Sequence, residues 1–182
     1  MNNAKSRCSC RLSNEFRLLW SQHVYRTRFF IISTAADLAD LPYVTKWLLQ
    51  NPGDFAMVLG RFYGKNQAET FKNLLTEHLA IAGELVNAAK NQNAAEVNSA
   101  RKRWYENADK IAEFLSDINP NWSYKKWASF LYDHLRMTEN EARLRLTGKY
   151  PEDIVEFNNI EQEAMRMADY MTDGINSQFQ LC

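Results

Sequence analysis

Residues 67–91 read QAETFKNLLTEHLAIAGELVNAAKN, and this stretch decides the fold class. Its apolar residues recur at alternating intervals of three and four, which is the spacing of one face of an α-helix. They are Phe71, Leu74, Leu75, Ile81, Ala82, Leu85 and Ala89. The pattern therefore predicts a long amphipathic helix, and it places one polar residue, His78, among the apolar ones.

The same periodicity continues on both sides of this segment. Three more long helices are predicted over residues 14–38, 100–118 and 152–175, with shorter periodic segments between them. One of the shorter helices should start at a capping box formed by Thr138 and Glu141, because a threonine followed three residues later by a glutamate is typical of a helix start. Alternation with a period of two, which would indicate strands, is not found. We therefore predict an all-α fold, an up-down helical bundle of about four long helices with short connecting helices.

Length and charge limit the domain organisation and the partners. A chain of 182 residues suits one domain, and we assign residues 14–178 to the bundle, with a disordered N-terminal tail over 1–13 and a C-terminal tail over 179–182. Lys plus Arg and Asp plus Glu number 22 each, so no net positive field favours nucleic acid. No apolar run approaches the roughly 20 residues that span a bilayer. We expect a cytoplasmic protein with no membrane or nucleic-acid partner.

The three cysteines lie near the two ends of the chain. Cys8 and Cys10 precede the predicted bundle, and Cys182 is the last residue. This distribution excludes a disulfide framework. The Cys8–Cys10 pair is also too sparse for a closed zinc site, which needs four ligands.

All three histidines of the chain fall on the apolar faces of different predicted helices. His23 lies between Trp20 and Thr27, His78 is on the face described above, and His134 follows Phe130 and Leu131. Glu161 occupies a similar position in the last helix, beside Phe157 and Met165. A buried lone carboxylate costs several kcal/mol unless it is paired or binds a metal, so Glu161 requires a partner.

These four residues predict a metal site at the centre of the bundle. Imidazole and carboxylate ligands together suit Fe, Mn, Ni or Zn, so His23, His78, His134 and Glu161 are candidate ligands of a single transition metal ion. The paired Glu-x-x-His spacing of di-iron bundles is absent, which favours a mononuclear site. Its role could be redox, hydrolytic or sensing.

Two other interior polar residues are candidates to support these ligands. Asn107 lies between Trp104 and Ile111 on its helix, and Thr27 continues the face that carries His23. An asparagine at such a position can orient an imidazole ring, although a buried amide also serves in ordinary helix-to-helix hydrogen bonds.

An alternative function uses the same residues without a metal. Buried histidine, glutamate and asparagine side chains can form a structural hydrogen-bond network. In that case the protein would be a non-enzymatic module for protein interaction or for binding a small ligand, with a homodimer or another protein as its partner. Neither a phosphate-binding loop nor a dinucleotide-binding fingerprint is present.

Several short segments also carry a resemblance. They are LWSQHV at 19–24, LTEHL at 75–79, RWYENAD at 103–109, YDHL at 132–135 and ADYM at 168–171. With these segments, residues 15–176 resemble a family of uncharacterised bacterial proteins, and the resemblance implies an all-helical fold. Some members carry an acetylglutamate kinase label, but that activity needs an α/β domain with glycine-rich phosphate loops, and this sequence predicts neither.

Overall fold

The computed structural model describes residues 2–181, with side chains described from residue 10 onward. Over this range the chain forms six helices and short turns, and no described residue belongs to a strand. The helices are α1 (Asn2–Ala35), α2 (Leu41–Leu48), α3 (Asn51–Lys90), α4 (Ala94–Ile118), α5 (Tyr124–Leu146) and α6 (Tyr150–Phe179). The predicted all-α fold is confirmed, although all the helices except α2 are long.

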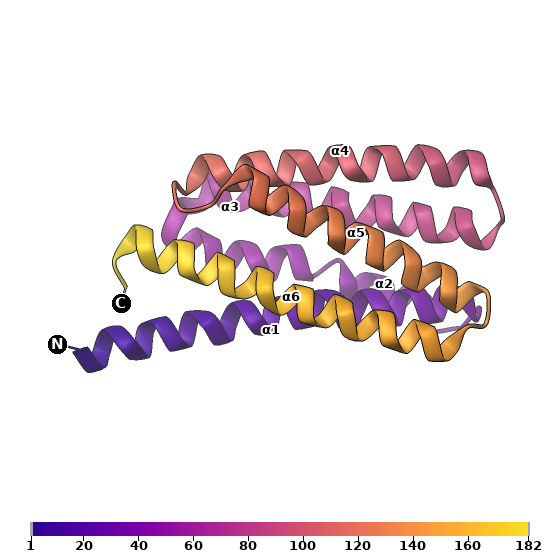
Figure 1. Cartoon of the computed structure of the whole chain (residues 1–182), viewed down its shortest axis with the longest axis horizontal. Coiled ribbons are helices and arrows are strands. Elements are labelled where there is room, and N and C mark those ends of the chain that lie inside the picture. Colours follow the sequence, from indigo (N-terminus) through magenta and orange to yellow (C-terminus); the bar gives the residue numbers. More distant parts are fainter. Residues whose placement is uncertain (1, 182) are drawn as a thin grey trace.

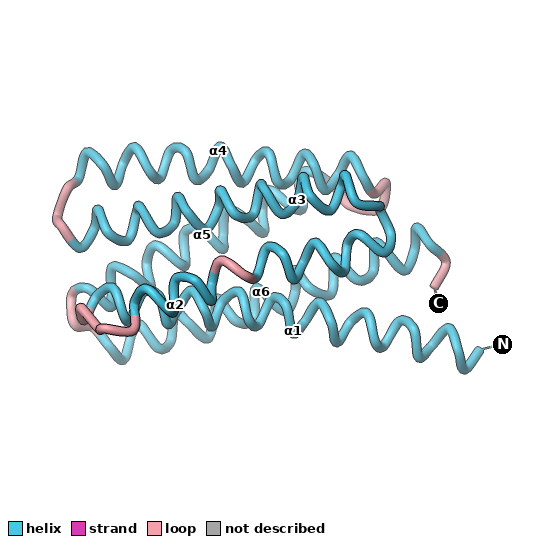
Figure 2. Tube along the Cα trace, turned by 180° about the vertical axis from the view of Figure 1, so that it is seen from behind, coloured by secondary structure: helices cyan, strands magenta, loops and turns pink. Residues whose placement is uncertain are grey.

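Helix α3 consists of two arms that meet at Gly64. This glycine has φ 80° and ψ 171°, a backbone conformation that residues with a side chain rarely adopt. A Cβ atom placed on Gly60 would lie 3.4 Å from Cβ of Ala68, whereas the same two positions in a straight helix would be roughly 12 Å apart. The chain therefore reverses direction at Gly64, as Figure 2 shows.

Along the chain, α1, the two arms of α3, α4, α5 and α6 alternate in direction (Figure 1). Helix α1 packs against α6, α3 packs against α4, and α5 lies between α4 and α6. As a result α1, the second arm of α3 and α5 all run in the same direction, and the first arm of α3 runs in the opposite one. The described helices do not include one with the length and apolarity needed to cross a membrane.

The N-terminal boundary differs from the prediction. We expected a disordered tail over residues 1–13, but α1 already begins at Asn2, and residue 1 lies outside the described part. Leu12 is buried at 3% exposure and belongs to the core with Phe16 and Leu19. The apolar face of this helix thus extends to Leu12, which lies four residues, or about one turn, before Phe16. At the other end, α6 stops at Phe179, close to the predicted boundary, and Cys182 lies outside the described residues.

The predicted capping box is wrong. Thr138 and Glu141 lie inside the continuous helix α5, and both are buried. The Glu141 carboxylate does not turn back to the Thr138 backbone but accepts a hydrogen bond of 2.6 Å from Arg28 of α1. Glu141 therefore forms a contact between two helices and does not cap the start of one.

Candidate metal centre

The three histidines meet in the centre of the bundle. They come from three parallel segments, two whole helices and the second arm of α3. His23 comes from α1, His78 from the second arm of α3 and His134 from α5. One ring nitrogen from each histidine can be chosen so that the three nitrogens all lie within 4.8 Å of one another. The ring centroids are 5.6 to 6.5 Å apart. We call these three residues the histidine cluster.

The histidine cluster is sealed from solvent, and burial keeps it uncharged. The three side chains are 2 to 3% exposed. Desolvation lowers the pKa of His23 to about 4 and that of His78 to about 3, and it lowers the pKa of His134 well below the usual value. All three imidazoles are therefore neutral at neutral pH, and each offers one nitrogen lone pair.

The proton position in His23 follows from its hydrogen bond to Asn51. Nδ1 of His23 lies 3.0 Å from Oδ1 of Asn51, and Nδ2 of the same amide donates to the Leu19 carbonyl at 3.1 Å. Since the amide nitrogen is committed to a carbonyl, the amide oxygen faces the imidazole and can only accept. Nδ1 of His23 must then carry the proton, which leaves the lone pair on Nε2.

His78 is held in the same manner by Asn107 of α4. The distance from Nδ1 of His78 to Oδ1 of Asn107 is 3.0 Å. Nδ2 of Asn107 donates to the Leu74 carbonyl at 3.1 Å and to Oε2 of Glu77 at 3.0 Å. The Nδ1 proton is again fixed by an amide oxygen, and Nε2 is the basic nitrogen.

His134 differs from the other two histidines because its Nδ1 has no hydrogen-bond partner within the described residues. Two tryptophans border the cluster, with Trp20 5.5 Å from His23 and Trp104 5.3 Å from His78 between ring centroids. Neither indole N–H has a partner within the same range. The centre thus contains more hydrogen-bonding capacity than residues 2–181 use, which is uncommon for buried polar groups.

Glu161, the fourth candidate ligand, does not join the histidine cluster. Its carboxylate accepts a hydrogen bond of 2.6 Å from the Tyr25 hydroxyl at the surface between α1 and α6. The buried face of α6 follows the sequence Ile160, Ala164, Met167 and Met171. Glu161 comes one residue after this face, which places it about 100° around the helix. A boundary position was mistaken for an interior one, and the correction leaves three nitrogens as the candidate ligands.

The two supporting candidates have different roles. Asn107 lies where an orienting residue is needed, as described above. Thr27 bonds to the backbone instead, because its hydroxyl donates to the His23 carbonyl at 2.8 Å.

The sequence analysis missed Asn51 as a partner of His23, because Asn51-Pro52-Gly53 is a pattern typical of the end of a helix. The available signal was that an asparagine at the first turn of a helix has a side chain free to bond elsewhere.

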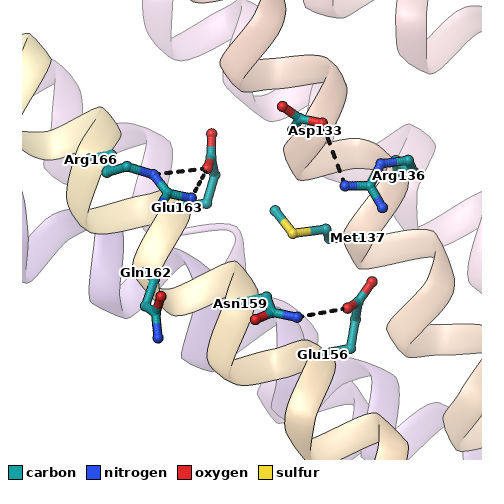
Figure 3. Close-up of a pocket in the computed structure, with 8 residues that line it drawn as sticks. All are labelled: Asp133, Arg136, Met137, Glu156, Asn159, Gln162, Glu163 and Arg166. Carbon is teal, nitrogen blue, oxygen red and sulfur yellow. Dashed lines mark hydrogen bonds and ion pairs between the residues drawn. The ribbon is translucent and has the colours of Figure 1, made fainter.

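Figure 3 shows a surface groove between α5 and α6, and no histidine of the cluster lines it. It is lined by Asp133, Arg136, Met137, Glu156, Asn159, Gln162, Glu163 and Arg166. Each arginine pairs with an acid of its own helix, Arg136 with Asp133 at 3.4 Å and Arg166 with Glu163. Asp133 precedes His134 directly, but neighbouring residues point about 100° apart around a helix. The groove and the histidine cluster are separate features.

Three neutral imidazoles form a suitable donor set for a transition metal. Zinc bonds to histidine nitrogen at about 2.0 to 2.1 Å, so tetrahedral ligand nitrogens lie roughly 3.3 Å apart. The nitrogens of the cluster lie within 4.8 Å of one another, so the rings would have to move together by up to about 1.5 Å to bind one ion. No cysteine or carboxylate of the described residues belongs to the group, so the described side chains supply three of the four ligands of a tetrahedral site.

Comparison with known proteins gives no assignment. No protein-family model, curated protein or solved structure matches the chain, so the resemblance of residues 15–176 to a bacterial family stays a prediction.

Proposed function

We propose that this protein binds one transition metal ion through the histidine cluster. The observation that carries the proposal is the pair of asparagine contacts, which hold the Nδ1 protons of His23 and His78 and leave both Nε2 atoms basic. Metal-binding histidines usually donate their other N–H to a carbonyl or carboxylate, which fixes the ring and the tautomer. Asn51 and Asn107 supply amide oxygens in that position.

The donor set points to the class of metal. Imidazole suits zinc, copper, iron and nickel, whereas carboxylate and water suit manganese, magnesium and calcium. With Glu161 outside the group, the protein ligands are nitrogen only. We therefore propose zinc as the first candidate, with copper, nickel and iron as competitors, and manganese as the least favoured of the metals that the sequence suggested.

The charge of the site limits its chemistry. A divalent ion on three neutral imidazoles would place an uncompensated charge in the core, which is costly. An anionic fourth ligand reduces that cost, and a zinc ion with three protein ligands commonly carries a water whose pKa falls to about 7. A bound hydroxide is thus the ligand that this environment favours.

Burial limits the substrate. With each histidine at most 3% exposed, a peptide, nucleotide or sugar cannot reach the ion without opening the bundle. We propose that the centre senses or acts on a molecule of a few atoms, and we regard hydrolysis of a macromolecule as excluded by the same burial.

Metal analysis of the protein, purified without chelator, tests this proposal. The wild type should contain about one equivalent of metal, and His78→Ala should lose nearly all of it, because two imidazoles hold an ion far more weakly than three. Glu161→Gln is the matched control and should keep the full content, as should a protein with both Cys8 and Cys10 changed to serine.

Two results would contradict the proposal. Metal that persists in His78→Ala would place the ion elsewhere in the chain. Wild-type protein that takes up no zinc, copper, nickel or iron, with histidine variants that are merely less stable, would make the cluster a structural network and favour the interaction module as the function.

A further inference from the structure

A small cavity lies beside the histidine cluster. Its wall is mostly apolar and includes Phe30, Leu79 and Val86. The space open to the centre of a water-sized molecule is about 10 Å³, which is enough for roughly one such molecule. A charged ligand would lose its hydration there without compensation, so the cavity suits a neutral one.

The cavity lies one helical turn beyond the cluster. Thr27, Ala82 and Thr138 all line it, and each follows a histidine of the cluster by four residues. Residues four apart stack on the same face of a helix, about one 5.4 Å pitch along its axis. Because α1, the second arm of α3 and α5 run in the same direction (Figure 1), these three positions form the layer next to the histidine layer.

Trp104 connects the two layers. Its ring lies 5.3 Å from that of His78, and the same side chain lines the cavity. Trp104 Nε1 and Thr138 Oγ1 are buried and have no hydrogen-bond partner within residues 2–181. The cavity is therefore apolar over most of its wall, and two of its lining residues have unused hydrogen-bonding groups.

One lining residue of the cavity, Glu139, forms an ion pair near the protein surface. Glu139 lines the cavity, and its carboxylate accepts hydrogen bonds of 3.0 and 2.9 Å from Nε of Arg101 on α4. The side chain of Glu139 is 24% exposed and that of Arg101 is 39% exposed, so the cavity wall includes a residue that water reaches. Exposed ion pairs of this kind contribute little to stability and can separate readily.

We infer that this cavity is the chamber through which a small neutral molecule, of the size of water or a diatomic gas, reaches the metal centre. The inference rests on the proposed function and adds the class of ligand and its route. The route passes from the Arg101–Glu139 pair, through the layer of Thr27, Ala82 and Thr138, to the histidine cluster.

Xenon binding tests the chamber without any metal. In the metal-free wild type, xenon should occupy the cavity, as seen by crystallography under xenon pressure. Gly83 lines the cavity, and a Cβ placed on it would lie 3.5 Å from the Phe30 ring, an ordinary contact distance. Gly83→Ala should therefore fill the space without strain and remove the xenon. Gly53→Ala is the control, because nothing lies within 4 Å of its Cβ position.

Ligand binding to cobalt-loaded protein tests the route. Cobalt(II) replaces zinc and gives a visible spectrum that responds to a new ligand, and hydrogen cyanide is a small molecule that is mostly neutral at neutral pH. It would enter as HCN, give its proton to the bound hydroxide, which leaves as water, and bind the ion as cyanide. We expect Gly83→Ala to slow this spectral change at least tenfold at unchanged cobalt content, and Gly53→Ala to match the wild type.

The outcomes separate the two proposals. Absence of xenon from the wild-type cavity, or equal cyanide rates in wild type and Gly83→Ala at full cobalt content, would overturn the chamber while the metal site stands. A wild type that binds no cobalt would overturn the proposed function, and the chamber as a ligand route with it.

Discussion

Two buried polar clusters lie in this bundle, and α1 and α5 contribute to both. The ionic cluster consists of Arg28, Glu141, Arg145 and Asp153, and it joins α1, α5 and α6. Arg28 donates to Glu141 at 2.6 Å and to Asp153 at 2.9 and 3.2 Å, and Arg145 lies 3.4 Å from Asp153. Two arginines meet two acidic side chains, so the chain itself provides the partners.

The histidine cluster has no such balance. Its members are neutral, Nδ1 of His134 has no partner in the described part of the chain, and neighbouring indole N–H groups are equally unused. The comparison teaches that burial of polar side chains alone does not identify a functional site. A cluster that its own chain satisfies holds helices together, and one with spare capacity has room for a ligand.

Removing Arg28 should give the largest effect on folding. Arg28→Met leaves Glu141 and Asp153 buried without their main partner, and such a break typically costs about 3 to 5 kcal/mol. Urea unfolding measures the loss. The control is Arg17→Met, because Arg17 makes a similar two-bond contact with Asp169 of α6 at 2.7 and 2.8 Å, but at an exposed position. For Arg17→Met we expect the free energy of unfolding to fall by less than about 1 kcal/mol. Equal losses in the two variants would show that burial does not increase the contribution of the ionic cluster to stability.

The pH dependence of stability should separate the clusters by sign. The folded pKa of His23 is about 4 and that of His78 about 3, below the unfolded value of 6.5, so the unfolded chain takes up protons first and stability falls as pH drops from 6.5 toward 4. Burial raises the pKa of Glu141 from 4.5 to about 7, so its contribution has the opposite sign and is lost as pH rises through that interval.

The histidines together contribute more to the pH dependence than Glu141 does. The free energy of unfolding of the metal-free protein should therefore fall by on the order of 3 kcal/mol between pH 7 and pH 4. Urea unfolding at a series of pH values measures this loss, which should be steeper in Glu141→Gln. A stability that is flat or rises toward pH 4 would contradict the neutral, buried state of the histidine cluster.

Leucine substitutions should distinguish the members of the histidine cluster. His23→Leu leaves the Oδ1 atom of Asn51 without its donor and should cost about 1 to 3 kcal/mol in the metal-free protein. His134→Leu removes a ring whose Nδ1 is already unpaired, so the free energy of unfolding should be nearly unchanged. Both variants should lose the metal. A large loss of stability in metal-free His134→Leu would mean that this ring holds the core together in its own right.

Glu161→Gln should have the smallest effect. The side chain keeps an oxygen that can accept the Tyr25 hydrogen bond near the surface, so we expect a change within about 0.5 kcal/mol. Thermal unfolding and metal content measured on the same sample check this. A clear loss of metal in this variant would mean that Glu161 is a metal ligand after all.

The sequence placed the three histidines on buried faces, but it did not show whether they converge at one level. Helical spacing gives the face on which His23, His78 and His134 lie, and only the packing of the helices brings their rings together. The same spacing could not place Glu161, since one step at the edge of a face separates core from surface. The contact of Asn51 with His23 depends on how the start of α3 packs against α1. The sequence pattern of one helix does not show how it packs against another.

The helix boundaries show the same limit. The break in α3 at Gly64 depends on a local property of the backbone, a positive φ that suits glycine. Thr138 and Glu141 have the local pattern of a helix start, yet contact with Arg28 decided their role. Leu12 belongs to the core because of the helices that pack against α1, among them α3 and α6, and its own helix does not show that packing.

X-ray absorption at the zinc edge of the loaded protein tests the central claim most directly. We expect three imidazole nitrogens at about 2.0 to 2.1 Å, a fourth light ligand and no sulfur. In His134→Leu this imidazole signature should decrease or the zinc should be lost. Sulfur neighbours in the spectrum, or an unchanged imidazole signature in His134→Leu, would contradict the account, because the ion would then be bound outside the histidine cluster.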